Sequence, residues 1–400
     1  MSSTSQRSLP LNLRRPQHLP FTWTEDGEIH TGLWHSEGGW PAPERLEIID
    51  DRTNTDAAYR LATSGTAMLW RGDFHNARQL LGSLGRRIDR GTRKPSPDLT
   101  AAFRKHRADA AHRAQLLGML LIPLDADYTI PLRRSPDVRL ACTQSYGKSD
   151  QPSVTSLREL IGVIGAHEWR TNGVDIPALG ALIHPHYGVF SPVRGEYLDL
   201  VAAAPLPSGT LEDLVAFDIG TGTGVLSAIL AHRGIRHVIA TDQEPRALAC
   251  AIENIERLGF TDQVEVAPAD LFPVGRADLI VCNPPWIPAE ATTSTDHAVY
   301  DPDSRMLRGF LGGLALHLEP AGEGWLILSD IAERIGLRSR SELLDLFEDA
   351  GLTVAQRIDT RPTHRRAYDT TDPLHAARSN EVTSLWRLRS VNSGTEAGTA

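Results

Sequence analysis

Two short motifs in this chain combine residue types and spacings that can do chemistry. Asp218–Gly224 reads DIGTGTG, so an acidic residue precedes three glycines at alternate positions, and Asn283–Trp286 reads NPPW. Glycines allow a tight turn and a close approach of the backbone to a ligand, whereas an amide, two prolines and an indole suit a planar group. The pair predicts a nucleotide-like cofactor held next to a planar, nitrogen-bearing acceptor.

The glycine-rich motif and the acidic residues downstream of it predict the cofactor site. The dinucleotide fingerprint G-x-G-x-x-G would require a glycine where the chain has Val225, which argues against a nicotinamide cofactor. Asp242 ends the next apolar run and could accept hydrogen bonds from both hydroxyls of a ribose. Asp270 ends the run after that, with Leu271 as an apolar neighbour suited to an adenine. The predicted cofactor-binding residues are Asp218, Gly220, Gly222, Gly224, Asp242, Asp270, Leu271 and Asn283.

The NPPW motif predicts methyl transfer to a nitrogen. Transfer from a sulfonium is an in-line displacement, so the protein must mainly orient the lone pair of the acceptor. The side-chain oxygen of Asn283 and the carbonyl of Pro284 could accept both hydrogens of a planar NH₂ group and favour its pyramidalisation. The prolines fix the backbone, and Trp286 supplies a flat wall for a base or an amide. Asn283, Pro284 and Trp286 are the predicted catalytic residues.

Elements that could position these motifs alternate along the chain from Leu214 onward. Short apolar runs and helical patterns follow one another, which is typical of βαβ units and a parallel sheet. Seven strands are expected, at Leu214–Asp218, His237–Thr241, Gln263–Ala267, Ala277–Val281, Gly324–Ser329, Thr353–Asp359 and Glu381–Leu388. Helices are expected at Glu196–Val201, Val225–Arg233, Pro245–Leu258, Met306–Leu318 and Ser339–Ala350.

The order of these motifs resembles that of class I S-adenosylmethionine-dependent methyltransferases, and of their "methyltransferase small" group, over about Phe190 to Leu388. Within the group the chain is most similar to HemK-type release-factor glutamine methyltransferases. Three segments carry this similarity: Phe190-x-Pro192 with Glu196, Asn283–Pro288, and Tyr300-Asp301-Pro302 with Leu307 and Gly312-Gly313-Leu314. The resemblance implies an α/β, Rossmann-like, seven-stranded sheet with helices on both faces, and S-adenosyl-L-methionine as the cofactor.

Length and composition predict more than this one domain. A chain of 400 residues exceeds the usual size of a single domain. We expect a flexible segment over residues 1–40, an N-terminal module for substrate recognition over 41–185, mainly helical or α+β, the methyltransferase domain over 186–390, and a flexible tail over 391–400. Helices are expected in the module at Asp73–Arg90 and Asp98–Leu121.

The distribution of charge limits which classes of partner the protein can have. The formal net charge of −9 argues against nonspecific binding of nucleic acid by the whole surface. The segment from Arg86 to Arg113 nevertheless contains nine Lys or Arg and only three Asp, which allows one basic face. The alternative interpretation is a helix face that is charged only because it is exposed to solvent. Further arginines between the last two strands are Arg361, Arg365, Arg366 and Arg378. No signal peptide or membrane span is visible, so a cytoplasmic location is expected.

Neither cysteines nor histidines indicate a metal site or a disulfide framework. The three cysteines have no paired spacing, and we expect them to be reduced thiols. Four histidines are expected to be surface or loop residues, and no metal ligands are predicted. These histidines are His184, His186, His364 and His375.

The methyl acceptor is left open by the sequence. A protein glutamine is favoured by the HemK-like loop Tyr300–Leu314, but the amino group of adenine or guanine in RNA or DNA suits the same motif. A small-molecule acceptor is a third possibility. A noncatalytic subunit that binds S-adenosylmethionine is a further alternative, and an NAD-dependent oxidoreductase is disfavoured by Val225. The oligomeric state is not predicted.

Overall fold

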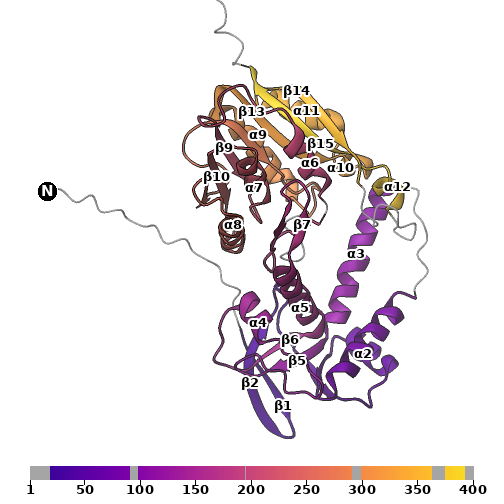
Figure 1. Cartoon of the computed structure of the whole chain (residues 1–400). Helices are drawn as coiled ribbons and strands as arrows, with labels where there is room; N and C mark the ends of the chain where they lie inside the picture. Colours follow the sequence, from indigo (N-terminus) through magenta and orange to yellow (C-terminus); the bar gives the residue numbers. More distant parts are fainter. Residues whose placement is uncertain (1–18, 91–97, 194, 291–298, 363–373, 392–400) are drawn as a thin grey trace, which may run out of the picture. The chain divides into compact units, whose positions relative to one another are not determined.

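The computed structural model describes residues 19–90, 98–193, 195–290, 299–362 and 374–391. The chain divides into two compact units (Figure 1). The N-terminal unit contains residues 1–89, 116–143 and 147–160, and the C-terminal unit contains residues 90–115, 144–146 and 161–400. The expected boundary between residues 185 and 186 therefore lies inside the C-terminal unit. Residues 90–115, which we placed in the N-terminal module, also belong to the C-terminal unit.

The C-terminal unit is built on a seven-stranded sheet with the order β11-β10-β9-β12-β13-β15-β14. The first five strands in this order are parallel, and β15 runs antiparallel to both of its neighbours. The strands are β9 Val215–Ile219, β10 His237–Asp242, β11 Val264–Pro268, β12 Ala277–Cys282, β13 Leu318–Ser329, β14 Leu352–Thr360 and β15 Thr383–Ser390. The predicted Rossmann-like sheet is confirmed. Its strand order reverses between β9 and β12, the position at which open α/β sheets bind ligands.

Helices cover both faces of this sheet because its strands are apolar on both sides. On one face Ala216 and Leu279 pack with α6 Glu196–Ala203, α7 Val225–His232 and α8 Pro245–Leu258. On the other face Phe217 and Ile280 pack with α9 Arg305–His317 and α11 Arg340–Asp349. The unit also contains α3 Leu99–Gly118 for most of its length, most of α5 Leu157–Asn172, the pair β7 Val174–Ile176 and β8 Ala181–Ile183, the 3-10 helix η2 Pro302–Ser304, α10 Ile331–Arg334 and α12 His375–Arg378.

The N-terminal unit contains a six-stranded mixed sheet with the order β1-β2-β6-β5-β4-β3. Its strands are β1 Leu19–Glu25, β2 Glu28–His35, β3 Leu46–Ile49, β4 Ala67–Trp70, β5 Leu120–Leu124 and β6 Ser153–Ser156. Its helices are α1 Thr55–Thr63, α2 Phe74–Ile88 and most of α4 Arg139–Tyr146. Leu120 and Leu121, which we expected at the end of a helix, belong to β5. The module is thus a mixed α/β structure.

A β-hairpin replaces part of the flexible segment expected over residues 1–40. Strands β1 and β2 pair in antiparallel fashion through Glu25 and Glu28. Asp26 and Gly27 between them have φ values of 50° and 85°, as a two-residue hairpin turn of the Asp-Gly type requires. This turn chemistry is the local reason for the correction. Residues 1–18 and 392–400, also expected to be flexible, lie outside the described residues.

Cys142, Cys250 and Cys282 are free and buried. Among the described residues, no helix is both long and apolar enough to cross a membrane.

Candidate active site

The glycine-rich turn connects β9 to α7 at the point where the strand order reverses. Gly220, Gly222 and Gly224 all have positive φ values, of 72°, 56° and 80°. A Cβ atom on Gly222 would meet nothing within 4 Å, whereas one on Gly224 would lie 3.2 Å from the Cα of Ala251. Gly222 therefore faces open space, which leaves the backbone accessible to a ligand, and Gly224 lets α8 pack against the turn.

Asp218 supports the turn from inside the protein. Its fully buried carboxylate accepts hydrogen bonds through Oδ2 from the hydroxyls of Thr221 and Ser227, at 2.7 and 2.6 Å, and from the Ser227 amide at 3.0 Å. The Oδ1 atom is buried and has no hydrogen-bond partner among the described residues. Burial raises the pKa of Asp218. An unsatisfied buried oxygen behind the turn fits a site that receives a hydrogen-bond donor from a ligand.

Asp242 is the last residue of β10 and lies next to the same turn. Its Oδ2 accepts a hydrogen bond from the Gly222 amide at 3.1 Å, and its Oδ1 accepts one from the Glu244 amide at 2.9 Å. Burial raises the pKa of Asp242, although the backbone amides oppose this shift. The Gln243 amide donates a third hydrogen bond, and the carboxylate retains acceptor capacity for a ribose hydroxyl. The residues present therefore fit the nucleoside part of S-adenosylmethionine.

Asp270 and Leu271 differ sharply in their surroundings. The Asp270 side chain is 71% exposed, and its nearest cation is Arg305 at 3.9 Å. Leu271 has a φ of 76°, rare for a residue with a Cβ. Its carbonyl accepts a hydrogen bond from the hydroxyl of Thr241 at 2.6 Å, and its side chain fills the space beside Gly309, where a Cβ would approach it to 2.6 Å. The protein thus holds Leu271 in place, while Asp270 lies in solvent.

Strand register brings the NPPW motif next to the glycine-rich turn. Cys282, at the end of β12, pairs with Ile219, at the end of β9. Asn283 and Gly220 therefore leave the sheet as neighbours at its carboxyl edge, as the sequence analysis predicted. Pro284 is buried beside them.

Two aromatic side chains hold the amide of Asn283. The indole nitrogen of Trp286 donates a hydrogen bond to Asn283 Oδ1 at 2.9 Å. Tyr197, on α6, is hydrogen-bonded to the same side chain, and burial raises the pKa of Tyr197, so it keeps its proton at neutral pH. The rings of Tyr197 and Trp286 are perpendicular, with their centroids 6.5 Å apart. Because an amide oxygen has two lone pairs, Oδ1 can accept a hydrogen of an acceptor nitrogen in addition to that of the Trp286 indole.

The sequence analysis assigned Trp286 only the role of a wall for stacking. In the structure its indole also orients Asn283, and its ring packs against three hydrophobic clusters, one of which includes Ile287 and Phe103. Tyr197 was missed, because its position in an amphipathic helix predicts burial and says nothing about its hydroxyl.

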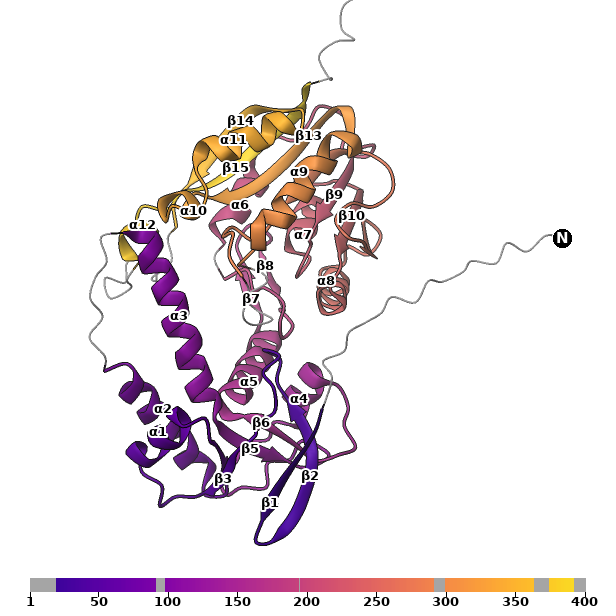
Figure 2. The same cartoon turned by 180° about the vertical axis from the view of Figure 1, so that it is seen from behind.

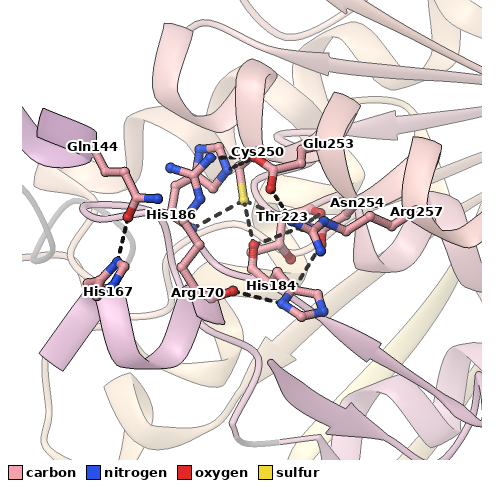
Figure 3. Close-up of polar contacts among 10 residues, drawn as sticks. All are labelled: Gln144, His167, Arg170, His184, His186, Thr223, Cys250, Glu253, Asn254 and Arg257. Atoms are coloured by element: carbon pink, nitrogen blue, oxygen red, sulfur yellow. Dashed lines mark hydrogen bonds and ion pairs between the residues drawn. The ribbon is translucent and has the colours of Figure 1, made fainter. Parts of the chain in front are cut away.

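A network of polar side chains lies behind the glycine-rich turn (Figure 3). Asn254, on α8, is fully buried. Its Oδ1 accepts a hydrogen bond from the His184 amide at 2.8 Å, and its Nδ2 donates to the carbonyls of Thr223 and His184 at 3.0 and 3.2 Å. One side chain thus connects the turn to the segment that enters the domain after β8.

Glu253, which precedes Asn254 on α8, forms ion pairs with two arginines and a hydrogen bond with a histidine. Its carboxylate lies 2.5 Å from Arg170, 2.6 Å from Arg257 and 2.8 Å from Nε2 of His186. Burial alone would raise the pKa of Glu253, but hydrogen bonds from these three partners lower it to about 2. Burial lowers the pKa of His186. His184 and His186, expected to be surface or loop residues, are indeed in a loop, but both are partly buried and hydrogen-bonded.

Comparison with known proteins identifies the domain that carries this site. Residues 182–328 match the family described as methyltransferase small domain. A release factor glutamine methyltransferase from Cereibacter sphaeroides is 33% identical over 174 residues, which are 38% of this chain and 60% of that protein. A ribosomal protein L11 methyltransferase from Symbiobacterium thermophilum is 41% identical over 78 residues, 18% of this chain and 26% of that protein. The chain spans about 60% of the length of the first of these relatives.

One solved structure is similar over half of the chain. A SAM-dependent methyltransferase from Thiobacillus denitrificans, in complex with S-adenosyl-L-homocysteine, is 17% identical and aligns with a TM-score of 0.35, covering 50% of this chain and 92% of that one. The family match confirms the predicted family for residues 182–328 and, with it, the predicted cofactor class, S-adenosylmethionine.

Proposed function

We propose that the protein, whose residues 182–328 match the methyltransferase small domain family, is an S-adenosylmethionine-dependent N-methyltransferase whose acceptor is the side-chain amide of a protein glutamine. The position of Asn283 carries this proposal. Asn283 comes directly after β12 and lies beside the glycine-rich turn, and two aromatic residues fix the orientation of its side-chain amide. A relative named release factor glutamine methyltransferase supports glutamine as the acceptor.

The task of the protein's own residues is to orient the acceptor nitrogen. Bound S-adenosylmethionine supplies an electrophilic methyl group. Asn283 Oδ1 and the Pro284 carbonyl accept the two hydrogens of the acceptor NH₂, which directs its lone pair away from them. Trp286 and Tyr197 keep Asn283 from rotating, so the acceptor finds the oxygen already in place. The Asn283 side chain is itself partly buried, with the buried Pro284 next to it in the chain.

The amino group of a nucleic acid base is a second candidate acceptor. Arg104 and Lys105 are exposed on α3, which is part of the same unit as the site. Lys105 already pairs with Asp109 at 3.2 Å, which reduces the positive charge of this face. Arg365 and Arg366, two of the further arginines named in the sequence, lie outside the described residues. Either acceptor would be met in the cytoplasm, the location that the sequence predicts.

The test is transfer of labelled methyl from S-adenosylmethionine to a cell lysate of the same organism, divided into protease-treated, RNase-treated and DNase-treated portions. Label lost only to protease supports a protein acceptor, and mass spectrometry should then place 14 Da on a glutamine of a release factor. Label lost only to a nuclease would reject the glutamine proposal in favour of a base. We expect Asn283→Ala to abolish transfer with little change in cofactor affinity, measured by calorimetry; parallel loss of both would show a structural role instead.

A further inference from the structure

Helix α3 packs onto the part of the C-terminal unit that follows the NPPW motif. The hydroxyl of Thr100, in its first turn, donates to the carbonyl of Ile335 at 2.7 Å. Phe103, one turn later, is buried in a hydrophobic cluster with Ile287, to which Trp286 also contributes. Figures 1 and 2 both show the beginning of α3 beside α12, and Ala377 of α12 belongs to this cluster, as does Leu374 just before that helix. Because α3 precedes residue 182, it lies outside the region that matches the family.

Arg107, one turn after Phe103, contacts two points of the chain downstream of Trp286. Its guanidinium carbon lies 3.8 Å from the centre of the Tyr300 ring, within the range of a cation–π interaction. Its Nη2 donates a hydrogen bond to the carbonyl of Glu290. The Phe103 ring also lies near the Tyr300 ring, with centroids 6.5 Å apart. One side chain of α3 therefore holds both Glu290 and Tyr300.

Tyr300 is in turn connected to the segment that follows the NPPW motif and, through Asp301 and Met306, to the glycine-rich turn. It forms a parallel bridge with Ile287, in which the Asp301 amide donates to the Ile287 carbonyl at 2.9 Å. The Asp301 carboxylate accepts hydrogen bonds from the amides of Met306 and Leu307, at 2.9 and 3.1 Å, at the start of α9. The Met306 side chain lies against Gly220 of the glycine-rich turn. A shift of Tyr300 would therefore also displace Ile287 and, with it, the neighbouring Trp286.

We propose that α3 forms one wall of the acceptor site and that Arg107 is a positioning residue, which holds Glu290 and Tyr300 so that Ile287 and Trp286 keep the orientation of Asn283. This inference rests on the proposed function, since it concerns the acceptor of the same site. It assigns acceptor recognition partly to a helix that the matched family region does not include. Arg107 acts through its planar guanidinium, which can stack on a ring and donate a hydrogen bond at the same time.

The experiment compares Arg107→Met, which keeps the apolar stem but removes the charge and the donors, with Arg104→Met. Arg104 is exposed on the same helix and serves as the matched control. Release factor purified from the same organism is the acceptor. We expect Arg107→Met to raise the KM for the release factor about tenfold or more, with the Kd for S-adenosylmethionine unchanged. Arg107→Lys should restore only part of the loss, and Arg104→Met should behave as the wild type.

Hydrogen exchange provides a readout that does not depend on the acceptor. In Arg107→Met the amides of Ile287 and Asp301, whose hydrogen bonds form the bridge at Tyr300, should exchange faster than in wild type and in Arg104→Met. Unchanged exchange at both amides would overturn the inference, whatever the activity. Equal KM values for Arg107→Met and Arg104→Met would also overturn it, as would a parallel loss of cofactor binding. If wild type does not methylate release factor, the glutamine proposal fails, and the exchange result still decides the role of Arg107.

Discussion

Replacement of Asn254 by leucine should damage both the stability of the protein and its affinity for S-adenosylmethionine. Leucine has a similar size, so the change removes hydrogen bonds with little change in volume. It removes the Asn254 partner of three backbone groups, the amide and carbonyl of His184, which is partly buried, and the buried carbonyl of Thr223; the His184 carbonyl keeps only the weak Sγ–H donor of Cys250 at 3.5 Å. At about 1 kcal/mol for each group, the low end for unsatisfied buried groups, the free energy of unfolding should fall by about 3 kcal/mol.

The effect on the cofactor follows from the single bond to Thr223, which lies in the glycine-rich turn. If the turn has to be ordered when the cofactor binds, the binding free energy becomes about 1 kcal/mol less favourable, which raises the Kd for S-adenosylmethionine about fivefold. Urea unfolding gives the first quantity, and calorimetric titration of the folded variant gives the second. Asn380→Ala is the control, because Asn380 is exposed and its side chain donates to the carbonyl of Ala376. A destabilised variant with wild-type affinity for the cofactor would refute the idea that Asn254 holds the turn.

Two further predictions concern the same region. Gly222→Ala and Gly259→Ala each place a Cβ in open space at a positive φ, of 56° and 75°, so each should cost about 1–2 kcal/mol of stability by urea unfolding. Only Gly222→Ala should also weaken cofactor binding in calorimetry; equal weakening by both would place the cofactor elsewhere. Glu253→Gln should destabilise the protein most above pH 4.5, the ordinary pKa of this carboxyl, because its folded-state pKa is about 2. As the pH falls from 4.5 toward 2 wild type loses this contribution, so urea midpoints of the two proteins should converge; a constant difference would contradict the assignment.

The sheet of the C-terminal unit could be predicted because its strands are short, apolar and separated by helices with clear ends. Helix α8 begins and ends at the predicted residues, since Pro245 starts it and Gly259 follows its last turn with a φ of 75°. Strand β13 begins at Leu318, earlier than the predicted Gly324, since Pro320 and Gly322 mask the start of the strand. The predicted helix that ends at Leu121 merged α3, most of which belongs to the C-terminal unit, with β5, a buried strand of the N-terminal unit with a similar apolar character.

The site was predictable only where the order of elements determines it. Register between β9 and β12 places Asn283 beside Gly220, and a parallel sheet allows little else. The direction of a side chain is a different matter. Tyr197 meets Asn283 because α6 packs on the sheet, and the indole of Trp286 turns toward Asn283 because three clusters hold its ring. Neither contact leaves a periodic signal in the sequence.

The two halves of the proposed reaction therefore depend on different kinds of information. The cofactor cradle is local: Asp218, its glycines and Asp242 lie close in sequence, and their contacts follow from one βαβ unit. The proposed wall of the acceptor site is not local, because Arg107 contacts Tyr300 and the carbonyl of Glu290, which lies 183 positions later in the sequence. Contacts of this kind can change between relatives without disturbing the cradle. Acceptor choice is accordingly expected to vary with α3, while cofactor choice stays with the turn after β9.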